Sequence, residues 1–510
     1  MRRILDLPLL VILMAIGALA MYLPAAHAMT QRDYGLARAF FYPATLFVVL
    51  ALLLGIATRA NRPGHRARSH LLALVGTFSV LPLMLAVPLR EAVPDTSLFN
   101  AWWEMVSSLT TTGASLFEPA RLPGSVHLWR ALVGWMGGFF VLVTAVAILA
   151  PMNLGGFEVL TGAPAGQGAV TGAQTARFAD PSERLWRFTA TLFPVYGGLT
   201  LILWIALIIA GDQSLVAACH AMSTLATSGI SPLGGLGGAG GEPVPGSGVG
   251  GEAVIFVFLI FALSRRLYPG GRGQHHVAGL GRDPELRLAV LLVAVVSALL
   301  FLRHWIGAFE VDDVRNLPAA LRAFWGTTFT ILSFLTTTGF ASADWALARD
   351  WSGLETPGLV LAGLAVIGGG VATTAGGVKL LRVYALYRHG EREIERLIHP
   401  NSVGGAGAQA RRLRRQGAQM AWIFFMLFAL SIAVTMLALA LTGLGFEAAT
   451  TFAVASLATT GPLAAVAGEV PLAWAGLDTV ARAVTAAAMI LGRLETLAII
   501  ALLNPEFWRR

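Results

Sequence analysis

The sequence has very little cysteine and little charge, and both shortages exclude whole classes of protein. Its one cysteine, Cys219, leaves no partner for an intramolecular disulfide and excludes a cysteine-rich metal cluster. Only 13% of the 510 residues are charged while 56% are hydrophobic, so the chain does not have the composition of an ordinary soluble enzyme. The net charge of +8 does not indicate nucleic-acid binding, because Lys and Arg fall in the connections between apolar runs.

Two kinds of functional motif are also missing. The sequence has no dinucleotide fingerprint and no P-loop, since the glycine-rich stretch at residues 234–251 is followed by no Lys-Ser/Thr pair. It also has no cluster of His, Asp, Glu or Ser/Lys groups inside its apolar runs, which an integral-membrane enzyme would need. We therefore expect no catalytic residues, no organic cofactor and no enzymatic activity.

Long apolar runs are abundant, and about 20 apolar residues are enough to cross a bilayer as a helix. We read ten spans, at residues 8–22, 40–56, 71–89, 128–150, 185–210, 249–263, 286–302, 358–381, 420–441 and 472–503. The sequence therefore predicts an all-α integral membrane protein with ten transmembrane helices. Seven tryptophans near the span ends are predicted to anchor them at the membrane interface: Trp102, Trp103, Trp129, Trp135, Trp345, Trp351 and Trp508.

A short Thr/Ser-rich tract containing a glycine occurs four times, at residues 109–114, 226–230, 335–340 and 458–462. We call these the four glycine tracts; their glycines, Gly113, Gly229, Gly339 and Gly461, lie roughly 110 to 120 residues apart. Each tract follows a segment too short to cross a bilayer but long enough to enter it and turn back, at residues 98–109, 215–226, 324–335 and 446–458. The spacing predicts four copies of one unit: helix, re-entrant helix, tract, helix.

These predicted units divide the chain into an N-terminal transmembrane hairpin at residues 1–60 and four pore repeats at residues 61–155, 156–270, 271–400 and 401–510. Irregular backbone at membrane depth persists only where it is buried in protein or lines a wet cavity. A dehydrated cation needs a ring of oxygens, which backbone carbonyls supply without a fixed charge. Glycine permits the backbone angles that turn successive carbonyls the same way. We therefore expect the four tracts to close one ring around a common axis.

The eighth span contains a second irregular segment, at residues 367–379. Five glycines interrupt it, and glycine at this density unwinds a helix and frees its carbonyls. Such a loop is tolerated in a bilayer only beside a cavity. The alternative interpretation is a face of small residues that packs against a neighbouring helix.

Two cations accompany these features. Arg493 is the one charge deep in the last span, where a charge costs a few kcal/mol on insertion scales, so it is a candidate functional residue. The alternative is an ion pair that only holds helices together, although Glu495, two positions on, points to a different helix face and is a poor partner. Lys379 follows the glycine-rich loop, and the alternative for it is a side chain that extends to the membrane interface.

The basic residues give the expected orientation. Arginines within residues 2–3, 59–68, 177–187, 265–287, 388–415 and 509–510 fall on one side if the ten spans alternate, and the positive-inside rule makes that side cytoplasmic. The opposite loops are more acidic, so the tracts are expected to open outward into a mouth that attracts cations. Residues 1–28 also have the pattern of a secretory signal peptide, but its removal would leave the orientation of the later spans unchanged.

The sequence resembles the TrkH family, the membrane subunits of bacterial Trk potassium uptake systems, within the wider Trk/Ktr/HKT group of channel-like transporters. The stretches that carry the resemblance are SSLTTTGAS at residues 107–115, WMGGFFVLVTAVAIL at 135–149, RDPE at 282–285, TTTGFASADW at 336–345, GGGVATTAGGVKLLR at 368–382, GRLE at 492–495 and PEFWR at 505–509. In this order, across nearly the whole chain, they are highly specific together. The N-terminal hairpin is similar to TrkH and not to the Ktr branch, which lacks it.

This resemblance implies a potassium-uptake pore in the bacterial inner membrane, with both termini cytoplasmic and K⁺ as the transported ion. The implied potassium-binding filter, formed mainly by backbone carbonyls, consists of Thr111, Thr112, Gly113, Thr227, Ser228, Gly229, Thr337, Thr338, Gly339, Thr459, Thr460 and Gly461. Some plant relatives carry Ser at the first filter glycine and prefer sodium, so glycine at all four positions favours potassium.

The implied gate lies below this filter and consists of Gly368, Gly369, Gly370, Thr373, Thr374, Gly376, Gly377, Lys379 and Arg493. The loop departs from the family's usual Gly-Ser-Thr-Gly-Gly-Gly core, because this sequence has Ala372 and Ala375 there. With fewer glycines than the family's usual core, the loop is expected to have fewer positions that can adopt unusual φ and ψ angles.

The resemblance also implies partners. We expect a homodimer of pore subunits in the lipid bilayer, bound to a cytoplasmic TrkA-like nucleotide-binding ring, because this chain has no nucleotide-binding motif of its own. The only implied metal is potassium at the filter residues. The alternative function is an ion-coupled secondary transporter, a sodium or proton symporter with broken helices. That class would show two inverted halves in place of four parallel copies.

Overall fold

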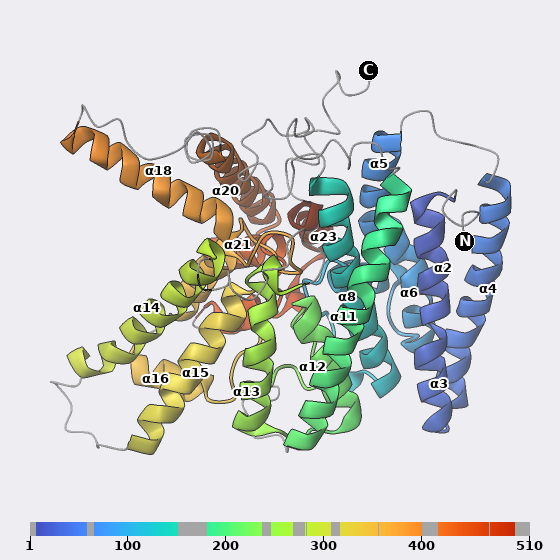
Figure 1. Cartoon of the computed structure of the whole chain (residues 1–510). Helices are drawn as coiled ribbons and strands as arrows, with labels where there is room; N and C mark the ends of the chain where they lie inside the picture. Colours follow the sequence, from blue (N-terminus) through green and yellow to red (C-terminus); the bar gives the residue numbers. More distant parts are fainter. Residues whose placement is uncertain are drawn as a thin grey trace.

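The computed structural model describes residues 7–58, 66–150, 181–236, 246–268, 281, 283–307, 317–354, 356–399, 417–468 and 470–494. Every regular element within these ranges is a helix (Figure 1). Seven helical segments of the described chain are long and apolar enough to cross a membrane: Leu9–Thr30, Tyr34–Thr58, Leu72–Ala92, Gly124–Leu149, Glu183–Ala210, Pro284–Arg303 and Ala418–Ala440. The all-α membrane class predicted from composition is confirmed.

Three of the ten predicted spans correspond to shorter helices. They are α13 (Gly248–Leu259), α17 (Gly358–Ile367) and α23 (Thr479–Leu494). The eighth predicted span is not continuous, because α17 ends at the glycine-rich loop and α18 (Leu380–Ile398) begins after it. The last predicted span extends to residue 503, but residues 495–510 lie outside the described part of the chain.

The N-terminal helices form a layer of their own at one edge of the molecule, coloured blue in Figure 1. The first predicted span is longer than expected, since α3 (Tyr22–Thr30) continues α2 (Leu9–Ala20) after a break at Met21. Both helices pack against α4 (Tyr34–Thr58), and α2 also contacts α5 (Arg66–Ser79) and α6 (Leu81–Ala92). This layer covers one side of the helices that carry the first tract.

Each glycine tract follows a short helix that lies between two other helices. The short helices are α7 (Leu98–Leu109), α12 (Ser214–Ala226), α15 (Leu317–Leu335) and α21 (Phe446–Leu457). Their flanking helices are, in the same order, α6 with α8 (Gly124–Thr144), α11 (Pro181–Ala210) with α13, α14 (Pro284–Gly307) with α17, and α20 (Ala418–Ala440) with α23. The third short helix begins at Leu317, seven residues before the predicted start, with Pro318 in its first turn, where a missing N–H is tolerated.

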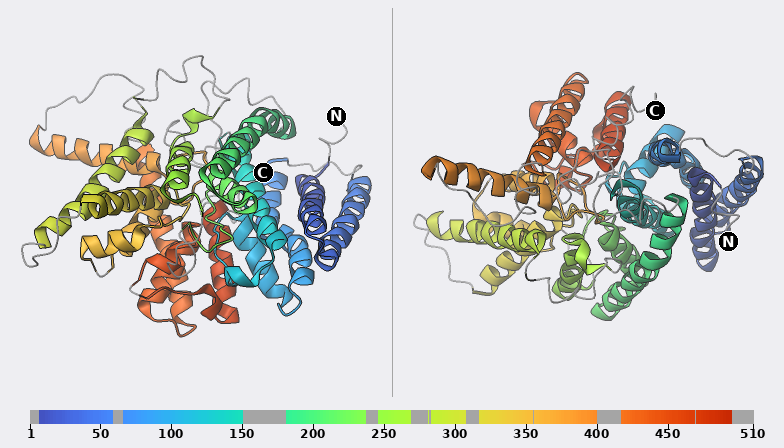
Figure 2. Two further views of the ribbon diagram at one scale, coloured as in Figure 1. Left: turned by 90° about the horizontal axis from the view of Figure 1, so that it is seen from below. Right: turned by 45° about the horizontal axis from the view of Figure 1, so that its top comes forward.

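The short helices are linked in a cycle by the flanking helices. Helix α8 packs against α12, α13 against α15, α17 against α21, and α23 returns to α7. Figure 2 shows the corresponding segments in chain order around the middle of the molecule, from cyan through green and yellow to red. The tracts therefore emerge toward a common centre.

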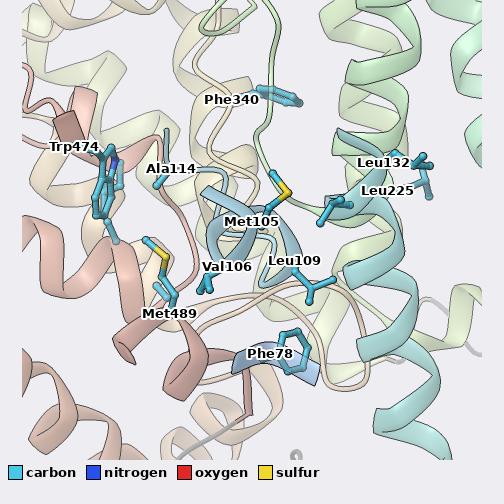
Figure 3. Close-up of a cluster of buried hydrophobic side chains, with 14 of the residues drawn as sticks. Phe78, Met105, Val106, Leu109, Ala114, Leu132, Leu225, Phe340, Trp474 and Met489 are labelled. Atoms are coloured by element: carbon cyan, nitrogen blue, oxygen red, sulfur yellow. The ribbon is translucent and has the colours of Figure 1, made fainter. Parts of the chain in front are cut away.

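Large apolar side chains surround this centre. Met105, Val106 and Leu109 of α7 meet side chains from α8, α12 and α23 in one cluster (Figure 3). Two tryptophans predicted to lie at the interface belong to this interior instead: Trp103 and Trp129 are fully buried. Their indole N–H groups are satisfied within the protein, by Thr485 Oγ1 and the Leu85 carbonyl respectively.

Candidate functional site

The four short helices end in the same hydrogen-bonded turn. After α7, the Thr111 N–H donates to the Ser108 carbonyl and the Thr112 N–H donates to the Ser107 carbonyl, both at 2.9 Å. The equivalent pairs in the other tracts are Thr227 to Thr224 with Ser228 to Ser223, Thr337 to Phe334 with Thr338 to Ser333, and Thr459 to Ser456 with Thr460 to Ala455. These two bonds define the Schellman motif, which stops a helix at a fixed residue. Each tract therefore leaves its helix in the same way.

The residue that reverses the backbone in this motif is a threonine in every tract. Thr111, Thr227, Thr337 and Thr459 have φ angles of 57°, 52°, 57° and 53°. Glycine normally occupies this left-handed position, and an L-residue there costs roughly 1–2 kcal/mol. A strained angle that recurs four times must be held by its surroundings, as is common at functional sites. Residue propensity assigns such angles to the glycines alone, so these threonines are not predictable from the sequence.

The tracts lie against one another in chain order and close a ring. A Cβ added to Gly113 would collide with the Ser228 carbonyl of the second tract, and one added to Gly229 would collide with the Thr338 carbonyl of the third. A Cβ on Gly339 would lie 3.0 Å from the Pro462 ring of the fourth tract. Each of the first three tracts thus lies in close contact with the next, and a side chain at any of these three glycines would crowd the neighbouring tract.

The ring is completed by a hydrogen bond that also makes the fourth tract different. The Gly461 N–H donates to the Thr112 carbonyl at 2.6 Å, which joins the last tract to the first. The Gly461 carbonyl accepts a hydrogen bond from Trp474 Nε1 at 3.1 Å. Gly461 also has no positive φ, whereas Gly113, Gly229 and Gly339 have φ of 72°, 64° and 83°. The four tracts are therefore alike at their threonines but not at their glycines.

The glycine-rich loop folds back on itself beneath the ring. The N–H groups of Val378, Lys379 and Leu380 donate to the carbonyls of Val366, Ile367 and Gly369, each at 2.9 Å. This pairing closes the loop as a narrow hairpin between α17 and α18. Gly368 and Gly377, one on each side of this hairpin, have positive φ angles of 73° and 76°. The segment is therefore an irregular loop, and the alternative of a helical packing face is not what the structure shows.

The tip of this loop contacts three of the four tracts or their helices. Thr374 Oγ1 donates to the Leu225 carbonyl at the end of α12 (3.0 Å), and the Gly376 N–H donates to Thr337 Oγ1 of the third tract (2.7 Å). A Cβ on Gly376 would collide with the Ala458 carbonyl of the fourth tract. The loop therefore lies directly against two of the strained threonines, Thr337 and Thr459.

Comparison with known proteins identifies the family to which this arrangement belongs. A model of the TrkH family, described as a cation transport protein, matches residues 38–234 and 253–509.

The chain belongs to the TrkH family.

Individual TrkH relatives match it over nearly their whole length. The Trk system potassium uptake protein TrkH of Salmonella typhimurium is 31% identical over 495 residues, which are 96% of each chain. The protein of the same name from Vibrio parahaemolyticus is 30% identical over 507 residues, 98% of each chain. A crystal structure of the potassium transporter TrkH from Vibrio parahaemolyticus matches with a TM-score of 0.78 at 26% identity, covering 99% of this chain and 100% of that one. As a TrkH-family member, the chain is a membrane cation transporter and not an enzyme.

Two cations of this TrkH-family chain line a cavity of about 30 Å³ beneath the loop. Arg493 of α23 and Lys379 are both 7% exposed and face this cavity together with Thr373 and Gly376. Lys379 Nζ donates to the Ala375 carbonyl, so the side chain turns into the protein and does not extend to the interface. One wall is a π-helical turn, Ala145–Leu149, that ends the fourth predicted span. Such turns are frequent at functional sites.

Buried polar groups brace the backbone that leaves the first tract. Glu104 of α7 accepts a hydrogen bond from the Leu116 N–H at 3.0 Å and forms an ion pair with Arg130 of α8 at 2.6 Å. The two side chains are 0% and 4% exposed. Because the carboxylate joins the short helix, the emerging chain and α8, it fixes the outer end of the tract.

Other groups occupy equivalent places behind the second and third tracts. His220 Nε2 bonds with Ser231 Oγ at 2.9 Å, and Asp212 lies on the other side of the ring. Burial opposes ionisation of Asp212, but the His220 ring and the Ser247 N–H outweigh it, so its pKa lies below the usual value. In the third unit, Thr330 Oγ1 accepts from the Ser342 N–H at 3.1 Å. The sequence pattern does not reveal these braces, because their hydrogen bonds join residues 11 or 12 positions apart.

Proposed function

We propose that this chain carries potassium ions into the cell through a single-chain pore. The TrkH proteins it matches are named potassium uptake proteins and a potassium transporter. The closed ring of four buried glycine tracts carries the proposal, because a dehydrated alkali cation is bound by rings of backbone carbonyls. In this proposal the filter comprises the three residues of each tract named in the sequence analysis, Thr111 to Gly113 in the first.

The proposed architecture has four pore repeats and an N-terminal hairpin, with ten membrane-crossing segments in the inner membrane and both termini in the cytoplasm. Support comes from the identical ends of the four short helices and from their cyclic packing. A secondary transporter built from two inverted halves has no reason to close a four-membered cycle, so the observations favour a pore over a symporter.

The proposed gate is the glycine-rich loop with Lys379 and Arg493. The loop contacts the tracts from one side of the ring, and both cations line the cavity beneath it. An ion leaving the ring must pass this loop, so the loop has to move for conduction.

We further propose a homodimer on a cytoplasmic TrkA-like nucleotide-binding ring, because a chain without a nucleotide motif needs a partner for nucleotide control.

The test is substitution of the first filter glycine. Gly113→Ser places a Cβ against the Ser228 carbonyl and removes the residue that tolerates a φ of 72°. We expect the ratio of rubidium to sodium flux in proteoliposomes to fall about tenfold, which corresponds to about 1.4 kcal/mol of ion discrimination. The matched control is Gly363→Ser in α17, where no atom lies within 4 Å of an added Cβ.

The two variants show whether Gly113 determines ion selectivity or is needed only for the fold. A folded Gly113→Ser protein with the selectivity of the unmodified chain would refute the proposal. Loss of selectivity in Gly363→Ser as well would show only a general sensitivity of the fold. Uptake by a potassium-auxotrophic host, with and without a ring partner, then tests transport in cells.

A further inference from the structure

Glu285 lies at the start of α14, far from the tracts in sequence, yet it holds the glycine-rich loop. Its side chain is 7% exposed. Its Oε1 accepts a hydrogen bond from the Val371 N–H at 2.8 Å. Val371 follows Gly370 in the middle of the loop, so a buried carboxylate of one membrane helix fixes the backbone of the proposed gate. Glu285 is the last residue of the RDPE stretch at residues 282–285, so this stretch helps to hold the loop.

The Glu285 side chain is one of several groups that bond the outer flank of the loop, the side that faces away from the ring. The Gly370 N–H donates at 3.0 Å to the carbonyl of Ala262, in the short 3-10 helix Ile260–Ala262 that follows α13. Next to it, Ser264 Oγ donates to Asp283. The turn after α13 and the start of α14 are thereby tied together, and both bond successive N–H groups of the loop. The charged groups that act on Glu285 are Asp283, Lys379 and Arg266.

The loop therefore has hydrogen bonds on two flanks, and the two sets have different effects on its movement. On the inner flank, Thr374 and Gly376 bond the backbone of α12 and a side chain of the third tract. These contacts must break when the loop clears the ring. On the outer flank, Gly370 and Val371 are bonded to the turn after α13 and to α14, neither of which carries a tract. The outer contacts set how firmly the loop is held in its blocking position.

We propose that Glu285 is a positioning residue that latches the loop beneath the ring, so that weakening the Glu285–Val371 bond raises ion flux through the chain in the absence of a regulatory partner. The inference rests on the proposed function, since it needs the loop to be the gate. Losing the acceptor leaves the buried Val371 N–H without a partner, which costs the desolvation penalty of that group. This loss is expected to increase the population of the displaced loop about tenfold.

The experiment measures rubidium uptake by proteoliposomes that contain the full chain alone. E285D keeps a carboxyl group but withdraws it by one methylene, and E285L removes the acceptor; both are expected to raise basal flux about tenfold. E285Q keeps an acceptor at the same reach and is expected to stay within about threefold of the unmodified chain. E91L, at an exposed carboxylate on α6, is the control for loss of a glutamate.

A second readout separates a latch from general damage. The ratio of rubidium to sodium flux should not change in E285D or E285L, because the tracts are untouched. Basal flux in both variants at or below the original level would overturn the inference, and so would a collapse of the flux ratio. If neither the unmodified chain nor E285D nor E285L shows flux that selects rubidium over sodium, the proposed function fails instead, so the two failures are distinguishable.

Discussion

The buried pair of Glu104 and Arg130 offers the sharpest test of how the first tract is supported. Its charges lie 2.6 Å apart at 0% and 4% exposure, and the carboxylate also accepts from the Leu116 N–H. Changing either member to glutamine leaves the other charge buried without its counterion. The double variant E104Q/R130Q removes both charges and keeps an amide oxygen that can still bond Leu116.

The expected magnitudes follow from the burial of both groups. Breaking a buried pair by removing one partner typically costs about 3–5 kcal/mol, whereas removing both charges together is close to neutral. We therefore expect E104Q and R130Q each to destabilise the chain by about 3–5 kcal/mol. The double variant should recover at least about 2 kcal/mol of the summed loss, because the two positions are directly coupled.

The assay is denaturant unfolding of the detergent-solubilised chain, followed by tryptophan fluorescence, with the same four proteins tested for rubidium and sodium flux. Glu91→Gln, at an exposed carboxylate, serves as the control and should unfold like the unmodified chain. Additive losses in the double variant, or single variants as stable as the unmodified protein, would refute the reasoning. A selectivity loss that tracks the stability loss would show that the brace also shapes the tract.

Two further substitutions address the fourth tract and the loop. Trp474→Phe keeps the ring contact with Phe452 (4.7 Å between centroids) but removes the donor to the Gly461 carbonyl. It should cost about 1–3 kcal/mol in the same unfolding assay and change the flux ratio, and an unaltered ratio would mean that this carbonyl does not face the ion. Gly376→Ala, which lacks room beside Thr459 Oγ1, should displace the loop and raise basal rubidium flux. Unchanged flux in this variant would argue against a blocking loop; Gly363→Ala is its control.

Much of the site was predictable because its signals are local in the sequence. The four tracts can be recognised by their composition and spacing, and the glycines that unwind the eighth span lie within a dozen residues of one another. The structure brings the four tracts into contact and has an irregular loop at the second segment. Whether the tracts bind potassium stays a prediction that the flux experiments test.

The parts that sequence reasoning missed depend on partners that are distant along the chain. From the sequence alone, Glu285 is an acidic residue at the start of a helix, and only the fold brings it to Val371, 86 positions away. Trp103 lies near a predicted span end, yet it faces Thr485 in the interior. The left-handed threonines were missed for a different reason, since propensity assigns that conformation to glycine and only the packed ring overrides it.

The junction between α23 and α7 has a consequence for biosynthesis. Trp103 bonds Thr485 and Arg482 bonds Asn100, in each case across 382 positions of the chain. Synthesis proceeds from the N-terminus, so the first short helix reaches the membrane long before its final neighbour exists. Until the last helix inserts, one flank of α7, with its polar side chains, has no protein to cover it. Ribosome-bound intermediates that stop before α23 should accordingly be the species most dependent on membrane chaperones and most exposed to quality-control proteases.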